Sequence, residues 1–182
     1  MEQLTEVTIQ PIDLAAWAPY ALEVQSAAFG LSPEEIAVRL HIVGRHAEQP
    51  GVLALGALNA GRLVGFGYGM PNRREHWWST VIQPYLEARG HGEWLDEVFA
   101  VTELHVLPDY QGRGLGSALI RALCEQSGRS RSILSAIDAE TPARRLYRSL
   151  GYRDLARAVR FPNTDRPYAV MGARLPLLDR SA

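Results

Sequence analysis

The feature that most constrains the fold is a strand that leads through a glycine-rich turn directly into a helix, within LHVLPDYQGRGLGSALIRAL (Leu104 to Leu123). Pro108 ends the strand, and apolar residues at helical spacing follow the turn. Such a turn leaves consecutive backbone N–H groups unpaired beside the positive end of the helix dipole. Because Gly112, Gly114 and Gly116 let the backbone approach an anion closely, the segment predicts a cradle for phosphate.

Three phosphate-binding patterns compete for this turn. The dinucleotide fingerprint GxGxxG does not match, because the glycines occupy every second position (Gly112, Gly114 and Gly116). The P-loop pattern does not match either, because it requires a lysine and all 19 basic residues are arginine. The third pattern is Q/R-x-x-G-x-G/A after a strand that ends in V-x-P. It matches at every position, namely Val106, Pro108, Gln111, Gly114 and Gly116.

On these residues the sequence resembles the GNAT superfamily of acyl-CoA-dependent N-acyltransferases. The segment AIDAETPARRLYRSLGYRD (Ala136 to Asp154) is similar to the closing strand–helix unit of that family. The matching residues are Ala143, Leu146, Tyr147, Gly151 and Tyr152. The resemblance covers roughly residues 5 to 175, with its specific motifs between 98 and 154. Thr141 and Pro142 stand where the family often has an asparagine.

The resemblance implies that the turn binds the pyrophosphate of acetyl-CoA, mostly through main-chain N–H groups. The residues concerned are Gln111, Gly112, Arg113, Gly114, Leu115, Gly116 and Ser117. It also implies that main-chain groups of Leu104, His105 and Val106 face pantetheine, where the fourth and fifth strands of the family splay apart. The alternatives are a simple strand-to-helix turn and a strand that is paired on both edges.

Aminolysis of a thioester requires an acid for the leaving thiolate, and the resemblance makes Tyr147 the candidate. A phenol of pKa near 10 lies about 1.5 units above a thiol, so the transfer is uphill by only about 2 kcal/mol. The alternative is a core role, because Ala143, Tyr147 and Leu150 share one helical stripe.

The reaction also requires a base that takes a proton from the attacking ammonium group. Glu103 is the candidate, directly or through a water, with His105 as the other option. Both side chains point to one face of the strand, opposite Leu104 and Val106. The alternative is a solvated strand face that carries polar residues.

Residues 71–97 form a predicted insert between the third and fourth strands. The insert contains three of the four tryptophans, Trp77, Trp78 and Trp94, which could line an acceptor pocket, form a dimer contact or make a small core. Arg73 and Arg74 could bind an acidic acceptor or form a solvated charge run. The sequence shows no metal-ligand spacing.

The element order predicts one α/β domain over residues 1–182, with a mixed sheet of six to seven strands and about four flanking helices. The expected helices are Leu14 to Phe29, Pro33 to Ala47, a short one around Pro84 to Arg89, the helix after the glycine-rich turn, and Pro142 to Leu150. Ser32 and Thr141 are the expected N-caps of the second and the last of these.

The net charge of −1 gives no reason to expect a nucleic-acid or membrane surface. The sequence shows no signal peptide, and a cytoplasmic location is expected. The resemblance predicts an N-acetyltransferase that moves an acetyl group from acetyl-CoA to a primary amine by direct attack in a ternary complex. The alternatives are a catalytically inactive CoA-binding regulatory protein and a transferase for a longer acyl-CoA. The resemblance does not identify the amine acceptor, which could be a small molecule or a peptide, and it is compatible with a homodimer.

Overall fold

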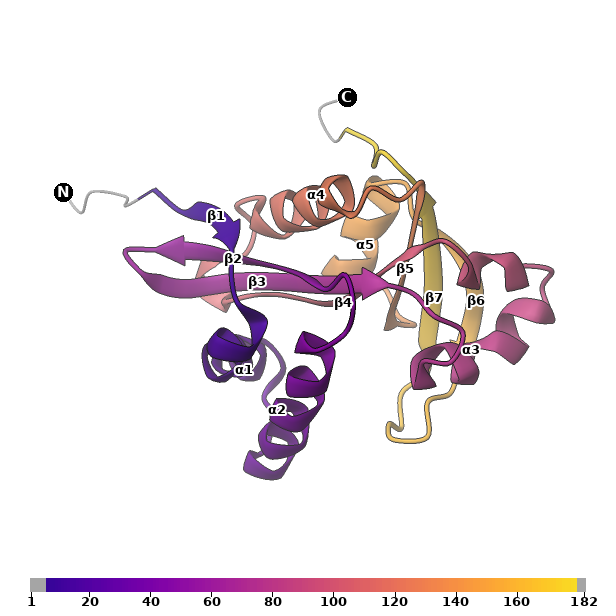
Figure 1. Cartoon of the computed structure of the whole chain (residues 1–182), viewed down its shortest axis with the longest axis horizontal. Helices are drawn as coiled ribbons and strands as arrows, with labels where there is room; N and C mark the ends of the chain where they lie inside the picture. Colours follow the sequence, from indigo (N-terminus) through magenta and orange to yellow (C-terminus); the bar gives the residue numbers. More distant parts are fainter. Residues whose placement is uncertain (1–5, 180–182) are drawn as a thin grey trace. The chain divides into compact units, whose positions relative to one another are not determined.

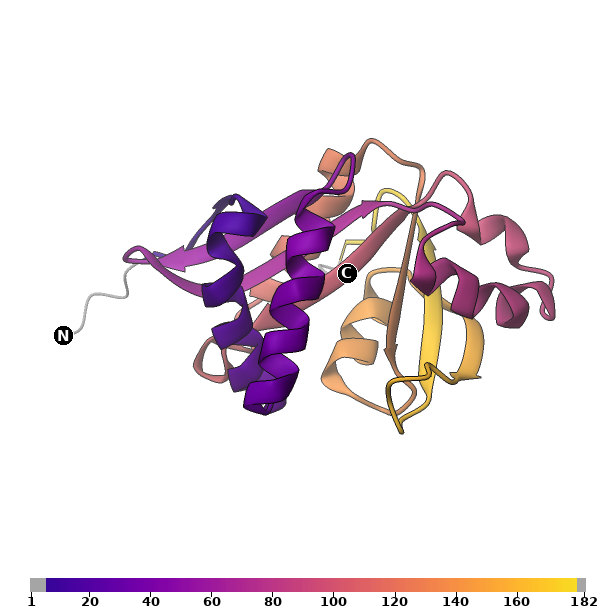
Figure 2. The ribbon, with the colours of Figure 1, turned by 60° about the horizontal axis from the view of Figure 1, so that its bottom comes forward.

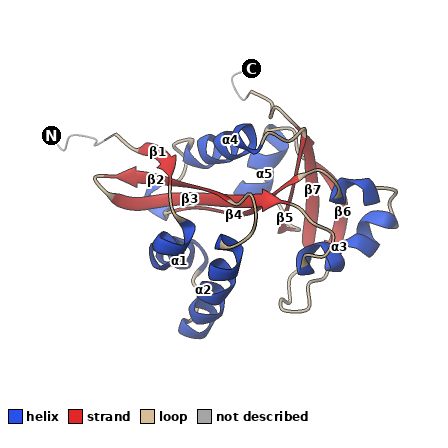
Figure 3. Ribbon diagram, in the orientation of Figure 1, coloured by secondary structure: helices blue, strands red, loops and turns tan. Residues whose placement is uncertain are grey.

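The computed structural model describes residues 6–179, whose strands form a seven-stranded mixed sheet in the order β1-β2-β3-β4-β5-β7-β6 (Figures 1 and 3). β4 and β5 are parallel, and β1–β2, β2–β3, β5–β7 and β6–β7 are antiparallel. The strands are β1 (Thr8–Pro11), β2 (Leu53–Asn59), β3 (Arg62–Pro71), β4 (Phe99–Val106), β5 (Arg131–Ile137), β6 (Arg153–Val159) and β7 (Tyr168–Arg174). The predicted α/β fold class is confirmed.

Five α-helices and two short 3₁₀ segments connect the strands. They are α1 (Leu14–Phe29), α2 (Pro33–Ala47), α3 (Trp77–Glu87), η1 (Gly92–Leu95), η2 (Pro108–Tyr110), α4 (Leu115–Ser127) and α5 (Pro142–Ser149). Both predicted N-caps are confirmed, since the hydroxyl of Ser32 accepts from the N–H of Glu35 at 3.2 Å and that of Thr141 from the N–H of Arg144 at 3.2 Å.

The chain falls into two compact units. The first comprises Met70 and the residues before it, together with Glu103–Gln126; the second comprises Pro71–Thr102, together with Ser127 and the residues after it. β4 therefore contributes its first residues to the second unit and its last residues to the first. The single domain over residues 1–182 stays a prediction.

In the first unit, helices cover both faces of the β2–β3 hairpin (Figures 1 and 2). Phe66 and Tyr68 of β3 pack into a core with apolar residues of α1 and α2. Gly67, between them, points the opposite way, and a Cβ added there would lie 3.1 Å from Leu123 of α4. The alternation of side chains along β3 therefore assigns α1 and α2 to one face and α4 to the other.

In the second unit, α3 packs against a core built from β4, β5, β6 and β7. The sequence predicted a helix around Pro84 to Arg89, whereas α3 runs from Trp77 to Glu87 with Pro84 inside it. A proline in a helix interior costs about 3 kcal/mol. Complete burial of Ile82 and Leu86 contributes about 1.5–3 kcal/mol each and offsets that cost.

Candidate active site

The turn after β4 is held by three backbone hydrogen bonds. The N–H of Leu107 donates to the carbonyl of Val64 on β3 at 2.8 Å, which joins the end of β4 to its neighbouring strand. The N–H of Tyr110 donates to Leu107 at 2.9 Å and that of Gln111 to Pro108 at 3.3 Å. The start of the turn is therefore a rigid 3₁₀ segment rather than a loose loop.

The rest of the turn exposes backbone donors, as the sequence predicted. The first backbone bond of α4 joins the N–H of Ala118 to the carbonyl of Gly114 at 3.0 Å. Within residues 6–179 no intramolecular acceptor is found for the N–H groups of residues 112–117. Gly112 and Gly114 have φ of 77° and 82°, and a Cβ added to either would meet no atom within 4 Å. This open cluster of N–H groups, hereafter the cradle, fits an anion such as a phosphate.

Two side-chain hydrogen bonds anchor the turn. The amide of Gln111 donates to the carbonyl of Val106 at 2.9 Å, so its side chain ties the turn back to β4. The amide of Asn59, in the β2–β3 turn, donates to the hydroxyl of Tyr110 at 2.7 Å. The contact between Asn59 and Tyr110 was not predicted from the sequence, because the two residues lie 51 positions apart.

Arg113 is the cation of the cradle. It is exposed, its guanidinium carbon lies 5.1 Å from the centre of the Tyr110 ring, and it donates to the carbonyl of Asp109 at 3.1 Å. No carboxylate of residues 6–179 pairs with it. Its charge is therefore available to a phosphate beside the cradle.

The end of β4 distributes its side chains as predicted. A Cβ added to Gly65 would lie 3.4 Å from Val106, and one added to Gly67 would lie 3.0 Å from Leu104, so these two side chains share the α4 face. Glu103 and His105 lie on the opposite face, toward α1 and α2.

Glu103 and His105 are in direct contact. His105 Nε2 lies 2.5 Å from Glu103 Oε2, and 8% of the His105 side chain is exposed against 24% of Glu103. Arg39 of α2 approaches Glu103 Oε1 at 3.8 Å. The structure thus brings the two candidate bases together, and the alternative of a solvated polar face does not hold for the buried His105.

A second polar pair lies on the same face. The hydroxyl of Tyr68 lies 3.0 Å from His46 Nδ1 of α2. Burial raises the pKa of Tyr68 far above its usual value, and the charge of Glu103 adds to this effect while Arg39 opposes it. Tyr68 therefore stays a neutral phenol.

Tyr147, the candidate acid, lies on α5 in the second unit. Its side chain is 8% exposed, and its ring centre lies 5.8 Å from that of Tyr152 at an angle of 62°. One turn earlier, Arg144 is 1% exposed and donates to both carboxylate oxygens of Asp154, at 2.8 and 2.9 Å. This bidentate pair, buried at Arg144 and partly exposed at Asp154, ties α5 to β6. The role of Tyr147 as an acid stays a prediction beside the core alternative.

The tryptophan-rich insert carries α3 and η1, and two of its tryptophans pack against the core of the second unit. Trp78 and Trp94 contact that core, which agrees with a structural role for them. Trp77 is 55% exposed, and its ring centre lies 6.1 Å from that of Phe161. The two candidate arginines of the insert pair with carboxylates, Arg73 with Glu75 at 2.8 Å and Arg74 with Asp96 at 2.7 Å.

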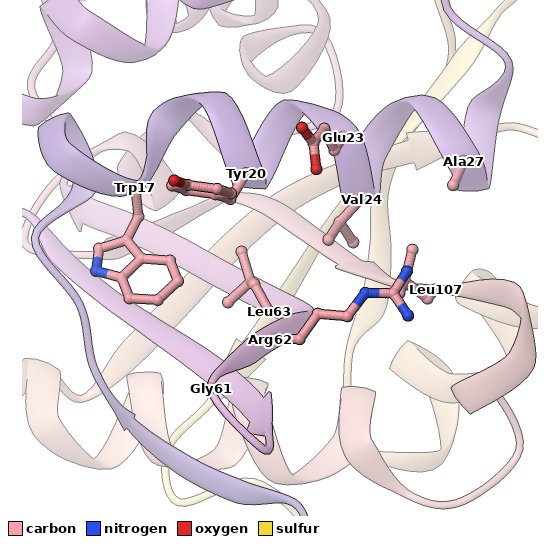
Figure 4. A pocket seen from close by; sticks show the side chains of 9 residues that line it. All are labelled: Trp17, Tyr20, Glu23, Val24, Ala27, Gly61, Arg62, Leu63 and Leu107. Carbon is pink, nitrogen blue, oxygen red and sulfur yellow. The ribbon is translucent and has the colours of Figure 1, made fainter.

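One cavity of the first unit is lined by none of the predicted site residues, although Leu107, which directly follows Val106, belongs to its lining (Figure 4). It has a volume of about 510 Å³ and lies between α1 and the turn from β2 to β3. Trp17 and Tyr20 form its aromatic wall, with ring centres 5.5 Å apart, and Glu23 and Arg62 are its charged residues. The sequence analysis gave no signal for this cavity because its lining comes from separate elements.

No helix within residues 6–179 is long and apolar enough to cross a membrane. No group of three or more His, Cys, Asp or Glu side chains there is arranged to hold a metal ion.

Comparison with known proteins gives three findings. The sequence profile described as Acetyltransferase (GNAT) family matches residues 16–152, which include the cradle and α5. A GCN5-like protein acetyltransferase of Mycobacterium tuberculosis is 35% identical over 123 residues, or 63% of this chain. The match spans 60% of that relative, so this chain covers less than two thirds of its length.

Solved structures share the fold. A GNAT-family structure from Desulfovibrio desulfuricans superposes with a TM-score of 0.68 at 17% identity, over 93% of this chain and 99% of its own. An N-acetyltransferase from Thermoplasma acidophilum in complex with coenzyme A gives a TM-score of 0.59 at 16% identity, over the same shares.

Proposed function

Since this chain belongs to the acetyltransferase (GNAT) family and is an acyltransferase, we propose that it moves an acetyl group from acetyl-CoA to a primary amine by direct attack in a ternary complex. The observation that carries the proposal is the cradle, in which the N–H groups of residues 112–117 lack intramolecular acceptors. Those donors stand at the N-terminus of α4, where the helix dipole adds positive potential.

The cradle suits the pyrophosphate of the donor. Two glycines with positive φ hold the backbone open, and no side chain stands above them. Arg113 adds an unpaired positive charge at the rim. The Thermoplasma N-acetyltransferase of the same fold binds coenzyme A, which supports this choice of donor. When bound, acetyl-CoA supplies the activated acyl group.

The protein's own groups supply the proton transfers. In this proposal Glu103 takes a proton from the ammonium group of the acceptor, so that the neutral amine can attack. The phenol O–H of Tyr147 donates a proton to the departing thiolate. No covalent enzyme intermediate is needed, and the one cysteine, Cys124, is buried in α4.

The acceptor in this proposal is a primary amine, either of a small molecule or of a peptide. The Mycobacterium relative acts as a protein acetyltransferase, which supports a peptide or protein amine as one class to test. A cytoplasmic location and a homodimer stay part of the proposal as expectations.

Isothermal titration of the purified protein with acetyl-CoA tests the donor, together with a Gly114→Trp variant that fills the space above the cradle. We expect micromolar binding by the wild-type protein and its loss in the variant. No binding by a well-folded wild-type protein would overturn the proposal. Binding without turnover of any amine would favour a CoA-binding regulatory protein, and preference for a longer acyl donor would identify a related transferase.

A further inference from the structure

We infer that His105 is a positioning residue for Glu103: it holds the carboxylate in place as the base of the reaction. This inference rests on the proposed function, in which Glu103 accepts the proton of the acceptor amine. His105 acts through Glu103 and touches no reacting atom.

The contact is a short hydrogen bond, in which His105 Nε2 lies 2.5 Å from Glu103 Oε2. In this inference Nε2 is the donor, because a carboxylate oxygen accepts. A hydrogen bond to a charged acceptor is about twice as strong as one between neutral groups, so this contact can fix the position of the carboxylate.

Two aromatic rings hold the imidazole in place. The ring of Phe29, at the end of α1, meets it edge-on with centres 5.2 Å apart and planes at 89°. Phe66 of β3 lies 5.5 Å away. Because the side chain is only 8% exposed, the imidazole cannot turn into solvent without losing these contacts. Glu103 is held by a fixed donor rather than a mobile one.

The charged and titratable groups around Glu103 come from α2 and β3. Arg39 of α2 lies 3.8 Å from Oε1, which is the oxygen not bound by His105. Tyr68 of β3 is a neutral phenol bonded to His46 of α2. From α1, Phe29 contributes an uncharged ring. Because Arg39 and Glu103 are 41% and 24% exposed, solvent screens their attraction, and the buried donor holds the carboxylate more firmly.

In this inference the two carboxylate oxygens of Glu103 have different roles. Oε2 contacts His105, Oε1 lies 3.8 Å from Arg39, and the Glu103 side chain as a whole is 24% exposed. Oε1 accepts a proton from the ammonium group of the acceptor. The N–H bond breaks, its electron pair stays on the amine nitrogen, and an O–H bond forms on Oε1. Water takes the proton away after the reaction.

Two substitutions of His105 separate positioning from packing. His105→Phe keeps a flat ring between Phe29 and Phe66 but lacks the donor, whereas His105→Gln places an amide N–H near the position of Nε2. We expect His105→Phe to lower kcat about tenfold or more. His105→Gln should recover most of the loss, with the KM for acetyl-CoA unchanged in both. His41→Gln, on an exposed histidine of α2, is the matched control and should behave as wild type.

An unchanged kcat in a folded His105→Phe, or a His105→Gln as impaired as His105→Phe, would overturn the inference. NMR of the imidazole nitrogens tests it without turnover. We expect the proton of His105 on Nε2 in the wild-type protein and a mixture of tautomers in Glu103→Ala. A proton on Nδ1 in the wild-type protein would overturn the inference. If the wild-type protein acetylates no amine, the proposed function fails by itself and the NMR result still decides the role of His105.

Discussion

Replacing Gly114 by alanine should weaken acetyl-CoA binding much more than it weakens the fold. The φ of Gly114 is 82°, and a Cβ there would meet no atom within 4 Å. The folding cost is therefore only that of an L-residue in the left-handed region, about 1–2 kcal/mol. For a chain of 182 residues, each kcal/mol corresponds to about 2–4 °C in Tm.

Binding should respond differently because the added methyl group stands over the N–H groups of the cradle. A pyrophosphate kept from close approach loses charge-assisted hydrogen bonds, and we expect Kd to rise at least about tenfold, or about 1.4 kcal/mol. Gly90→Ala is the matched control, since Gly90 has φ of 73° and equally open surroundings outside the cradle. Thermal unfolding and isothermal titration measure both effects. Equal Kd values for the two variants would refute the assignment of the cradle.

Three further predictions concern the second unit. Tyr147→Phe should lower kcat at least about tenfold and leave acetyl-CoA titration unchanged; an unaltered kcat would remove Tyr147 as the acid. A hydrogen bond from Arg157 lowers the pKa of Asp138, so its stabilisation is present above the unfolded pKa near 3.9 and is lost as pH falls below it. Urea unfolding should accordingly show Asp138→Asn to be less stable than wild type at pH 7, with a smaller difference at pH 3; a constant difference would contradict this. Gly172→Ala should destabilise by about 1–3 kcal/mol in the same assay, because its Cβ would lie 2.8 Å from the ring of Trp94, and unchanged stability would show that the ring can move.

Local patterns predicted most of the fold. Periodicity placed α1 and α2 at their observed bounds, and the caps at Ser32 and Thr141 follow from side chains that bond to N–H groups three residues away. The strand, turn and helix around the cradle were equally readable, because glycine spacing and apolar periodicity are properties of adjacent residues. α3 was placed wrongly because its proline is tolerated only through tertiary burial.

The candidate site was predictable only within β4. Alternation put Glu103 and His105 on one face, but the distance between their side chains depends on the aromatic rings of other elements. Arg39 comes from 64 residues earlier in the sequence, and the Asn59 anchor of the turn spans 51 residues. The periodicity of the sequence cannot predict such contacts, because the residues are brought together by the packing of whole helices and strands.

The most direct test of the central claim is the release of free thiol from acetyl-CoA in the presence of a panel of small amines and peptides, with each product identified by mass. The account predicts thiol release that depends on an amine, with one acetyl group added to that amine and none retained on the protein. Absence of release with every amine, despite tight binding of acetyl-CoA, or accumulation of an acetylated protein before the amine is added, would contradict it.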